Sequence, residues 1–227
     1  MNHVSGRSLR SIPLFSSVTP EALARIEAAC TWRSYEPPEA IVSHLDPSRD
    51  VYFLVTGAAR VSLYAPNGRQ VVFRDKSPGA IFGEFSALDG KPRSAYVEAL
   101  KTCLVAKMSD KTFVDILLRE PGVALALIRH MVGVAREQSG RIFEFSALAV
   151  NNRIHAEILR LAADTTTIDP APTHSDIASR ISTHREAVTR ELNRLVKSGL
   201  IKQDRHCLVI CDLDRLRRLV DDATDEG

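Results

Sequence analysis

The chain has 227 residues, of which 44% are hydrophobic and 26% are charged, and its formal net charge at pH 7 is +2. These values are typical of a globular protein with one large domain or two small ones, and so small a net charge indicates no particular partner. No stretch approaches the run of about 20 apolar residues that spans a membrane, and residues 1–10 lack the apolar core of a signal peptide. We therefore expect a cytoplasmic protein without a membrane partner.

The four cysteines are scattered, and only Cys207 and Cys211 lie near each other, in an apolar segment. Because a spacing of four places both side chains on one face of a strand, we expect buried thiols rather than a redox pair. No second pair of ligands completes a zinc site, and no pairing of a nucleophile with a base stands out. The sequence therefore predicts no metal, no bound cofactor and no catalytic residues.

Residues 12–30 carry apolar side chains at helical spacing. Ser17 or Thr19 can cap such a helix, and Pro20 suits its first turn. The sequence predicts a helix over this range.

Residues 39–108 change to the pattern of strands. Four runs rich in β-branched and aromatic residues span residues 51–57, 60–64, 70–73 and 95–108. Between two of these runs, Asn67-Gly68 is the strongest hairpin signal in the chain. Many short strands with regular turns predict a compact β-barrel or roll. Its core is expected to include Tyr52, Phe53, Leu54, Val61, Leu63 and Phe73.

Inside this roll, residues 82–95 have features that suit a small phosphate ester. Gly83 lets the backbone approach a ligand closely, and successive amides in such a turn form an anion-binding concavity. Arg93 offers a planar fork of donors to a phosphate, and Ser94 adds a hydroxyl. A site for phosphate alone would avoid Glu84, so we expect this carboxylate to accept from a sugar hydroxyl. A phosphate site beside a sugar hydroxyl indicates a ribose cyclic phosphate as the ligand. The alternative interpretation is a hairpin turn that carries a surface Glu–Arg pair.

The string Phe82-Gly83-Glu84, closing at Pro92-Arg93-Ser94-Ala95, resembles the phosphate-binding cassette of cyclic-nucleotide-binding domains. The resemblance implies that Glu84 binds the ribose 2′-hydroxyl and Arg93 binds the cyclic phosphate, with cAMP or cGMP as an allosteric effector. The further ligand-binding residues that it implies are Gly83, Phe85, Ser86, Ser94, and Val61 and Phe73 beside the base.

Residues 110–119 predict a short helix capped by Ser109 or Asp110, and Pro121-Gly122 begins a longer helix to about residue 149. Along the long helix, eight positions alternate in spacings of three and four: Leu125, Ile128, Val132, Ala135, Ser139, Ile142, Ser146 and Ala149. This heptad seam predicts a two-helix coiled coil, and hence a homodimer with twofold symmetry.

Ser139 is a polar residue in the middle of this seam. It can bond back to its own helix or set the register of the coiled coil. In catabolite-activator-type proteins, the corresponding pair of polar residues touches the adenine across the dimer interface, which implies ligand contacts for Gln138 and Ser139. Because Gln138 stands where threonine is usual, the choice between cAMP and cGMP stays open.

A further helix is expected to about residue 163, followed by a Thr- and Pro-rich loop over residues 164–173. Residues 174–196 then predict two short helices with a turn at Ser182-Thr183, which is a helix-turn-helix. From 174 to 205 there are seven Lys and Arg residues against four acids, an excess that suits phosphate contact. The alternative is a solvated charged helix face.

Arg185, Glu186 and Arg190 resemble the recognition helix of the catabolite-activator branch of the CRP/FNR superfamily. The resemblance implies that each arginine reaches a guanine edge and that Glu186 accepts from a cytosine amino group, in a palindromic TGTGA-like site. Ser182 stands where a glycine is common in the turn, and residues 197–211 look like the winged hairpin that follows. The implied DNA-binding residues are Thr183, His184, Arg185, Glu186, Thr189 and Arg190.

The resemblance runs from Pro13 to Cys211 and implies an α+β fold. Its parts are a cyclic-nucleotide-binding β-roll over residues 10–120, a dimerisation helix over 121–149 and a winged helix-turn-helix domain over 150–227. It implies a transcription regulator, with double-stranded DNA, a second copy of the chain and RNA polymerase as partners. The alternative is a regulator of this superfamily that senses a redox or gas signal and keeps a vestigial nucleotide cassette.

Overall fold

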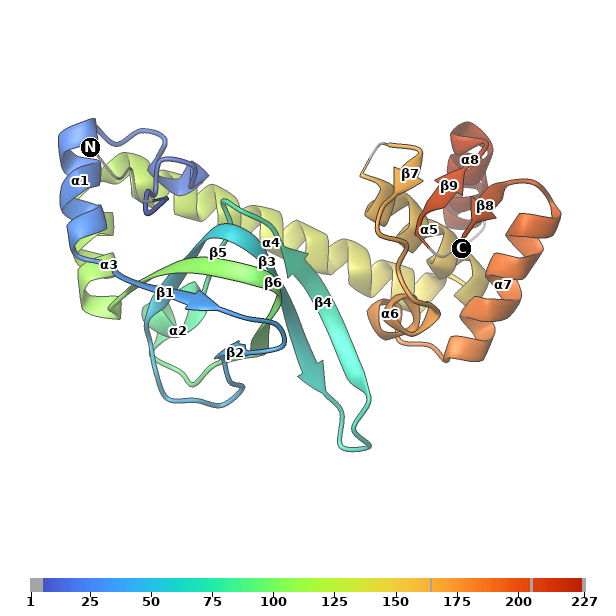
Figure 1. Ribbon diagram of the computed structural model, residues 1–227, viewed down its shortest axis with the longest axis horizontal. Helices are drawn as coiled ribbons and strands as arrows, with labels where there is room; N and C mark the ends of the chain where they lie inside the picture. Colours follow the sequence, from blue (N-terminus) through green and yellow to red (C-terminus); the bar gives the residue numbers. More distant parts are fainter. Residues whose placement is uncertain (1–5, 164, 205, 226–227) are drawn as a thin grey trace. The chain divides into compact units, whose positions relative to one another are not determined.

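The computed structural model describes residues 6–163, 165–204 and 206–225 (Figure 1). Contacts within the chain define two compact units, Met1–Val134 and Ala135–Gly227. The longest helix, α4 (Pro121–Ala147), begins in the first unit and ends in the second. The predicted boundaries at residues 120 and 149 stay a prediction.

The first unit begins with a short 3₁₀ helix, η1 (Pro13–Phe15), and the helix α1 (Pro20–Ala28). The expectation of one helix over residues 12–30 was therefore wrong in its first half. Thr19 has an extended backbone, and its hydroxyl accepts from the backbone nitrogen of Ala22 at 3.3 Å. Because this cap starts a new helix and proline at its first position offers no N–H, α1 begins at Pro20.

A six-stranded antiparallel sheet follows, with the main order β1-β6-β3-β4, β2 paired with β6 and β5 paired with β3. Its strands are β1 (Thr31–Tyr35), β2 (Ala40–Val42), β3 (Val51–Tyr64), β4 (Gln70–Lys76), β5 (Ile81–Phe82) and β6 (Tyr96–Met108). The hairpin at Asn67-Gly68 is confirmed, because Tyr64 pairs with Gln70 on either side of it.

The predicted strands 51–57 and 60–64 form the single strand β3. Gly57 lies where the register between β3 and β6 is irregular, and its φ of 90° is in the left-handed region. A Cβ at this position would lie 2.3 Å from the carbonyl oxygen of Thr102. Gly57 therefore allows the strand to bulge and continue, where a turn had been expected.

The two faces of β3 pack into different cores. Phe53 belongs to a core shared with residues of η1, α1, α3 (Asp110–Arg119) and the start of α4, while Tyr52 and Leu54 belong to a second core inside the roll. Of the two predicted caps of α3, Ser109 is the one observed, because its hydroxyl accepts from the backbone nitrogen of Thr112 at 3.2 Å. Phe73 is 37% exposed, so its expected place in the core was wrong.

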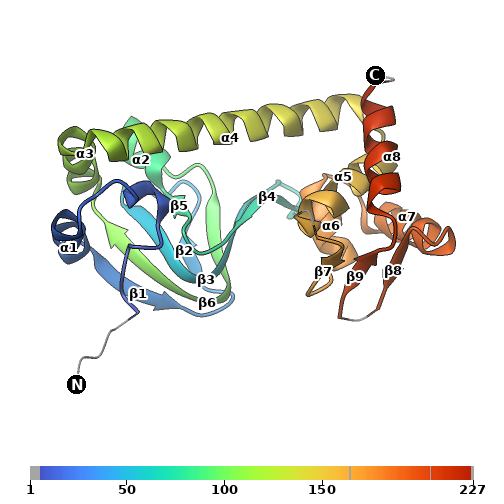
Figure 2. The ribbon, with the colours of Figure 1, turned by 90° about the horizontal axis from the view of Figure 1, so that it is seen from above.

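Helix α4 is continuous over its whole length (Figure 2). Val123 and Leu127 are buried against the roll, whereas the positions of the predicted seam are exposed in the single chain. An exposed apolar stripe on a long helix is the pattern expected of a coiled-coil interface.

The second unit contains α5 (Val150–Ala162), α6 (His174–Arg180), α7 (Arg185–Lys197) and α8 (Leu213–Asp225). A small antiparallel sheet has the order β7-β9-β8, with β7 at Thr167–Ile168, β8 at Ile201–Gln203 and β9 at Leu208–Ile210. The predicted loop thus contains one short strand. Apolar side chains of the helices and the sheet form one core.

The expected burial of the Cys207–Cys211 pair was wrong. Strand β9 ends before Cys211, which is exposed, and Cys207 is only half-buried. Within the part of the chain that the structure describes, no three His, Cys, Asp or Glu residues gather as metal ligands. None of the described helices is long and apolar enough to cross a membrane. Residues 1–5, part of the segment searched for a signal peptide, lie outside the described residues.

Candidate effector and DNA-binding sites

The predicted cassette lies between β5 and β6 in the first unit. Strand β5 ends at Phe82, and Gly83, with φ of 84°, precedes the short helix α2 (Glu84–Asp89). A Cβ at Gly83 would lie 2.7 Å from both Arg93 Nη1 and the carbonyl oxygen of Asp50. Glycine is therefore required here by the backbone conformation and by the close approach of Arg93.

Arg93 is only 2% exposed, and the protein holds its guanidinium on three sides. Its Nε donates to Ser48 Oγ at 3.1 Å, Nη1 to the Gly83 carbonyl at 3.1 Å and Nη2 to the Asp50 carbonyl at 2.8 Å. The guanidinium also lies 5.4 Å from the ring centre of Tyr52. Since a guanidinium has five N–H donors, two are left for a ligand. Sequence reasoning missed Ser48 and Asp50 as partners, because they precede Arg93 by more than 40 residues.

The Glu84 carboxylate is also buried, with 5% of the residue exposed. Among the described residues it forms no hydrogen bond and no ion pair with Arg93, and 3.7 Å separates Glu84 Oε1 from His130 Nε2. The alternative of a surface Glu–Arg pair is therefore wrong. The site contains a buried acceptor beside a buried arginine that has donors to spare.

The other predicted ligand residues of the first unit differ in their exposure. Ser86 is buried, Gly83 and Val61 are half-buried, and Phe85 and Ser94 are exposed. Phe73 lies on β4 opposite the irregularity in register that follows Val61. Gln138 and Ser139 belong to the second unit, so their contact with a ligand stays a prediction. The Ser139 hydroxyl donates to the Ala135 carbonyl at 3.1 Å, which is the local bond considered as the alternative.

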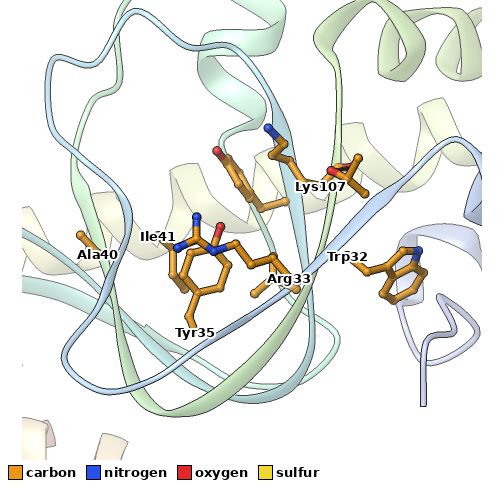
Figure 3. A pocket seen from close by; sticks show the side chains of 9 residues that line it. Trp32, Arg33, Tyr35, Ala40, Ile41 and Lys107 are labelled. Atoms are coloured by element: carbon orange, nitrogen blue, oxygen red, sulfur yellow. Dashed lines mark hydrogen bonds between the residues drawn. The ribbon is translucent and has the colours of Figure 1, made fainter. Parts of the chain in front are cut away.

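A separate pocket of about 470 Å³ opens among β1, β2, β3 and β6 (Figure 3). It shares Tyr52 with the surroundings of Arg93 but none of the predicted ligand-binding residues. Its charged side chains already have partners, because Arg33 pairs with Glu39 and Lys107 pairs with Asp50. Nine residues line this pocket: Thr31, Trp32, Arg33, Tyr35, Ala40, Ile41, Tyr52, Val105 and Lys107.

The helix-turn-helix of the second unit has its own local determinants. Thr173 and Asp176 form a reciprocal capping box at the start of α6, which fixes where the first helix begins. In the turn, Ser182 has φ of 52°, in the left-handed region that favours the glycine common at this position. Val188 and Leu192 lie on the buried face of α7.

The first turns of α7 present charged side chains to solvent. Arg185, Glu186 and Arg190 are exposed, and their side chains form no hydrogen bond or ion pair with any described residue. Thr189 is half-buried: its hydroxyl donates to the Arg185 carbonyl at 3.0 Å and lies 2.8 Å from His174 Nδ1. Thr183 is half-buried and His184 is exposed. Arg205, part of the predicted basic excess, lies outside the described residues.

Beneath this face, a buried pair joins α7 to α5. His155 Nε2 lies 2.6 Å from Glu191 Oε1, and Arg194 binds the same carboxylate. Burial lowers the pKa of His155. Although burial acts to raise the pKa of Glu191, hydrogen bonds from Arg194 and His155 lower it overall. The recognition helix is thus held at its middle by polar contacts as well as by the apolar core.

A second ionic cluster joins the end of α4 to α5 and α6. Arg141 donates to Glu157 at 2.9 Å and to the Arg180 carbonyl, while Arg160 binds both Glu157 and Glu144. Arg141 and Glu157 are buried. The sequence contained no signal for this cluster beyond charged residues three apart on two helices.

Comparison with known proteins gives these two sites a family context. The cyclic nucleotide-binding domain family matches residues 32–120, which include the cassette, and the Crp-like helix-turn-helix domain family matches residues 152–219. The fold and the two matches define the class: a DNA-binding transcription regulator with a cyclic-nucleotide-binding domain, and not an enzyme. Within this class, the chain belongs to the CRP/FNR family.

Individual relatives agree with this assignment. A CRP-like cAMP-activated global transcriptional regulator of Mycobacterium tuberculosis is 21% identical over 212 residues, covering 90% of this chain and 95% of the relative. FixK2 from Bradyrhizobium japonicum matches 84% of this chain and 96% of its own, with a TM-score of 0.73 and 22% identity. A CooA mutant from Carboxydothermus hydrogenoformans matches 95% of this chain and 98% of its own, with a TM-score of 0.79 and 16% identity. At these identities, the two structures show a shared fold.

Proposed function

We propose that this chain is a homodimeric transcription regulator whose DNA binding is controlled by a cyclic nucleotide bound at the cassette. One observation carries the proposal: Glu84 and Arg93 are both buried, and among the described residues the first has no hydrogen bond while the second has two donors to spare. Buried polar groups are costly unless they are paired. A ligand with a free hydroxyl beside a monoanionic phosphate would donate to Glu84 and accept from Arg93. A ribose cyclic phosphate has this chemistry.

We take cAMP as the first candidate effector and cGMP as the second. The M. tuberculosis relative is a cAMP-activated regulator, which supports this order. The bases differ at their polar edges, so the choice depends on groups beside the base, for which we propose Val61, Phe73, Ser94, Gln138 and Ser139. Gln138 can donate or accept, and it is therefore compatible with either base.

The dimer forms in this proposal through the exposed seam of α4. Leu125, Ile128, Val132 and Ile142 are all exposed in the single chain, although they are large and apolar. Pairing with the same stripe of a second copy removes this surface from water and satisfies the heptad spacing. Twofold symmetry then presents two copies of α7 to two half-sites of a palindrome.

The exposed residues of α7 support direct reading of a TGTGA-like half-site. Arg185 and Arg190 each offer a bidentate fork to a guanine edge, and Glu186 can accept from a cytosine amino group. For the effector to act as a switch, it must bind the DNA-competent arrangement of the dimer more tightly than the other arrangement. Regulation of transcription by such a dimer also requires contact with RNA polymerase, which we include as a proposed partner.

Nothing among the described residues favours a redox or gas sensor as a second candidate. The only cysteine before residue 100 is Cys30, and burial, with a smaller contribution from Glu27, raises its pKa to about 12. A buried thiol that is protonated at neutral pH is a weak nucleophile, which gives no support for a redox role of Cys30.

Calorimetric titration tests the proposal. The purified protein is titrated with cAMP and with cGMP, each with and without a TGTGA-type palindrome, and 5′-AMP serves as the control with an open phosphate. We expect one cyclic nucleotide to bind and to strengthen DNA binding, while 5′-AMP binds far more weakly. Binding of neither cyclic nucleotide by folded protein would refute the proposal and leave a vestigial cassette.

A further inference from the structure

His130 faces the cassette from the first half of α4. Its Nε2 atom lies 3.7 Å from Glu84 Oε1, which is beyond hydrogen-bond distance but within reach of an ion pair. This Nε2 atom is buried and has no hydrogen-bond partner among the described residues. Glu84 and His130 belong to the same compact unit, so their proximity is a property of that unit alone. An imidazole nitrogen without a hydrogen bond therefore faces a carboxylate oxygen across a short gap.

The gap has the dimensions of a bridging atom. One atom can lie about 2.8 Å from both Nε2 and Oε1, the usual length of a hydrogen bond, when these two are 3.7 Å apart. A hydroxyl fits this position, because it can donate to the carboxylate and accept from the imidazole N–H. A phosphate oxygen would meet the Glu84 carboxylate as a like charge, and an ammonium group could not accept.

We propose that His130 is a ligand-binding residue of the effector site, where its Nε2–H donates to the same ribose 2′-hydroxyl that donates to Glu84. This inference rests on the proposed function, since it assigns a further residue to the same site. In this arrangement the sugar connects the cassette directly to α4 within one chain. The effector thus contacts the dimer helix of its own chain through His130, independently of Gln138 and Ser139.

Binding measurements on His130 variants test this assignment. His130→Leu keeps the bulk of the side chain and removes the donor, whereas His130→Gln keeps an N–H donor. In His130→Leu, the buried hydroxyl that donates to the Glu84 carboxylate loses one hydrogen bond, so cAMP binding should weaken by about tenfold. His130→Gln should weaken it much less. Arg129→Gln, a change at the exposed neighbour on the same helix, is the matched control and should leave the affinity unchanged.

The comparison of cAMP with 2′-deoxy-cAMP separates a direct contact from a structural role. Because 2′-deoxy-cAMP lacks the bridging hydroxyl, it should bind the unaltered protein and His130→Leu with the same affinity to within about twofold. Equal weakening of both ligands by His130→Leu would overturn the assignment, as would unchanged cAMP binding. If His130→Leu does not fold, the imidazole ¹⁵N resonance of His130 in the unaltered protein gives the same decision. It should shift with cAMP and stay in place with 2′-deoxy-cAMP.

These outcomes also distinguish this inference from the proposed function. Folded, unaltered protein that binds no cyclic nucleotide would refute both. Normal binding by the unaltered protein, loss of binding in Arg93→Leu and normal cAMP binding in His130→Leu would refute the assignment of His130 alone.

Discussion

Arg93 in the cassette and Arg185 on the recognition helix are both arginines proposed to bind nucleotides, yet their surroundings are opposite. Arg93 is buried, and three of its donors already bind the protein. Arg185 is exposed, and its side chain is uncommitted within the described structure. A small ligand that is to be enclosed needs donors fixed in advance, because every unpaired group around it is costly. A DNA surface is large and hydrated, so side chains can reach it from an open helix face.

This difference predicts which changes affect stability and which affect binding alone. Removing a buried arginine leaves carbonyl groups without partners, so both the fold and the site are weakened. Removing an exposed arginine on a well-packed helix should change only the interface.

Arg93→Leu should show the buried side of the comparison. The carbonyl groups of Gly83 and Asp50 lose their donors, so the free energy of unfolding should fall by about 3 kcal/mol. Nucleotide affinity should fall by at least about a hundredfold, because the phosphate loses its charged partner. Urea denaturation and calorimetry measure the two effects. An unfolding free energy equal to that of the unaltered protein would show that the three bonds contribute nothing to stability.

Ile142→Glu tests the seam that both units share through α4. Ile142 is 65% exposed in the single chain, so a glutamate there should be harmless to a monomer. In a dimer it would bury a charge in each helix, and we expect dissociation to become about a hundredfold easier. Analytical ultracentrifugation measures this change. Leu118→Glu is the matched control, since Leu118 is 79% exposed but lies on α3, away from the seam. Identical sedimentation of both variants would count against the seam as the interface.

Arg185→Ala should show the exposed side of the comparison. We expect DNA affinity to fall by about 10- to 100-fold, with specificity relaxed at one base pair. The unfolding free energy should stay within about 0.5 kcal/mol of the original value. Fluorescence anisotropy with an intact and a singly substituted palindrome checks the first part. A loss of stability as large as that of Arg93→Leu would remove the distinction between the two sites.

Ser182→Gly should have the smallest effect, and it should be stabilising. Ser182 has φ of 52°, a conformation that is disfavoured for residues with a Cβ, so glycine should raise stability by up to about 1 kcal/mol. Thermal unfolding measures this gain. Ser198, with φ of −79°, is the control, and Ser198→Gly should give no gain. A lower melting temperature for Ser182→Gly would mean that the serine contributes more than its strain costs.

Local signals explain most of what the sequence predicted correctly. The Ser109 cap and the Asn67-Gly68 hairpin both depend on residues within a few positions of one another. The recognition of the two domains had the same basis, because the cassette and the start of α7 are each short strings. Contacts of this kind can be read from the order of the residues.

What the sequence could not predict depends on contacts between distant segments. The partners of Arg93 at Ser48 and Asp50 and the position of His130 opposite Glu84 become neighbours only after the roll has formed. Helical spacing over residues 12–30 concealed the fact that Thr19 starts a new helix. The exposure of Cys211 depends on where a three-residue strand ends.

The ionic cluster around Arg141 has a mechanical consequence. Arg141 and Glu144 belong to α4, but their partners lie on α5 and at the end of α6, so the last turns of α4 are fastened to the DNA-binding unit. The C-terminal end of α4 is therefore held rigidly against α5 and α6. A rotation of this end, caused by a ligand or by the partner chain, would be transmitted directly to α6. Substitutions that weaken the contacts of Arg141 would let the end of α4 rotate while the recognition helix keeps its position.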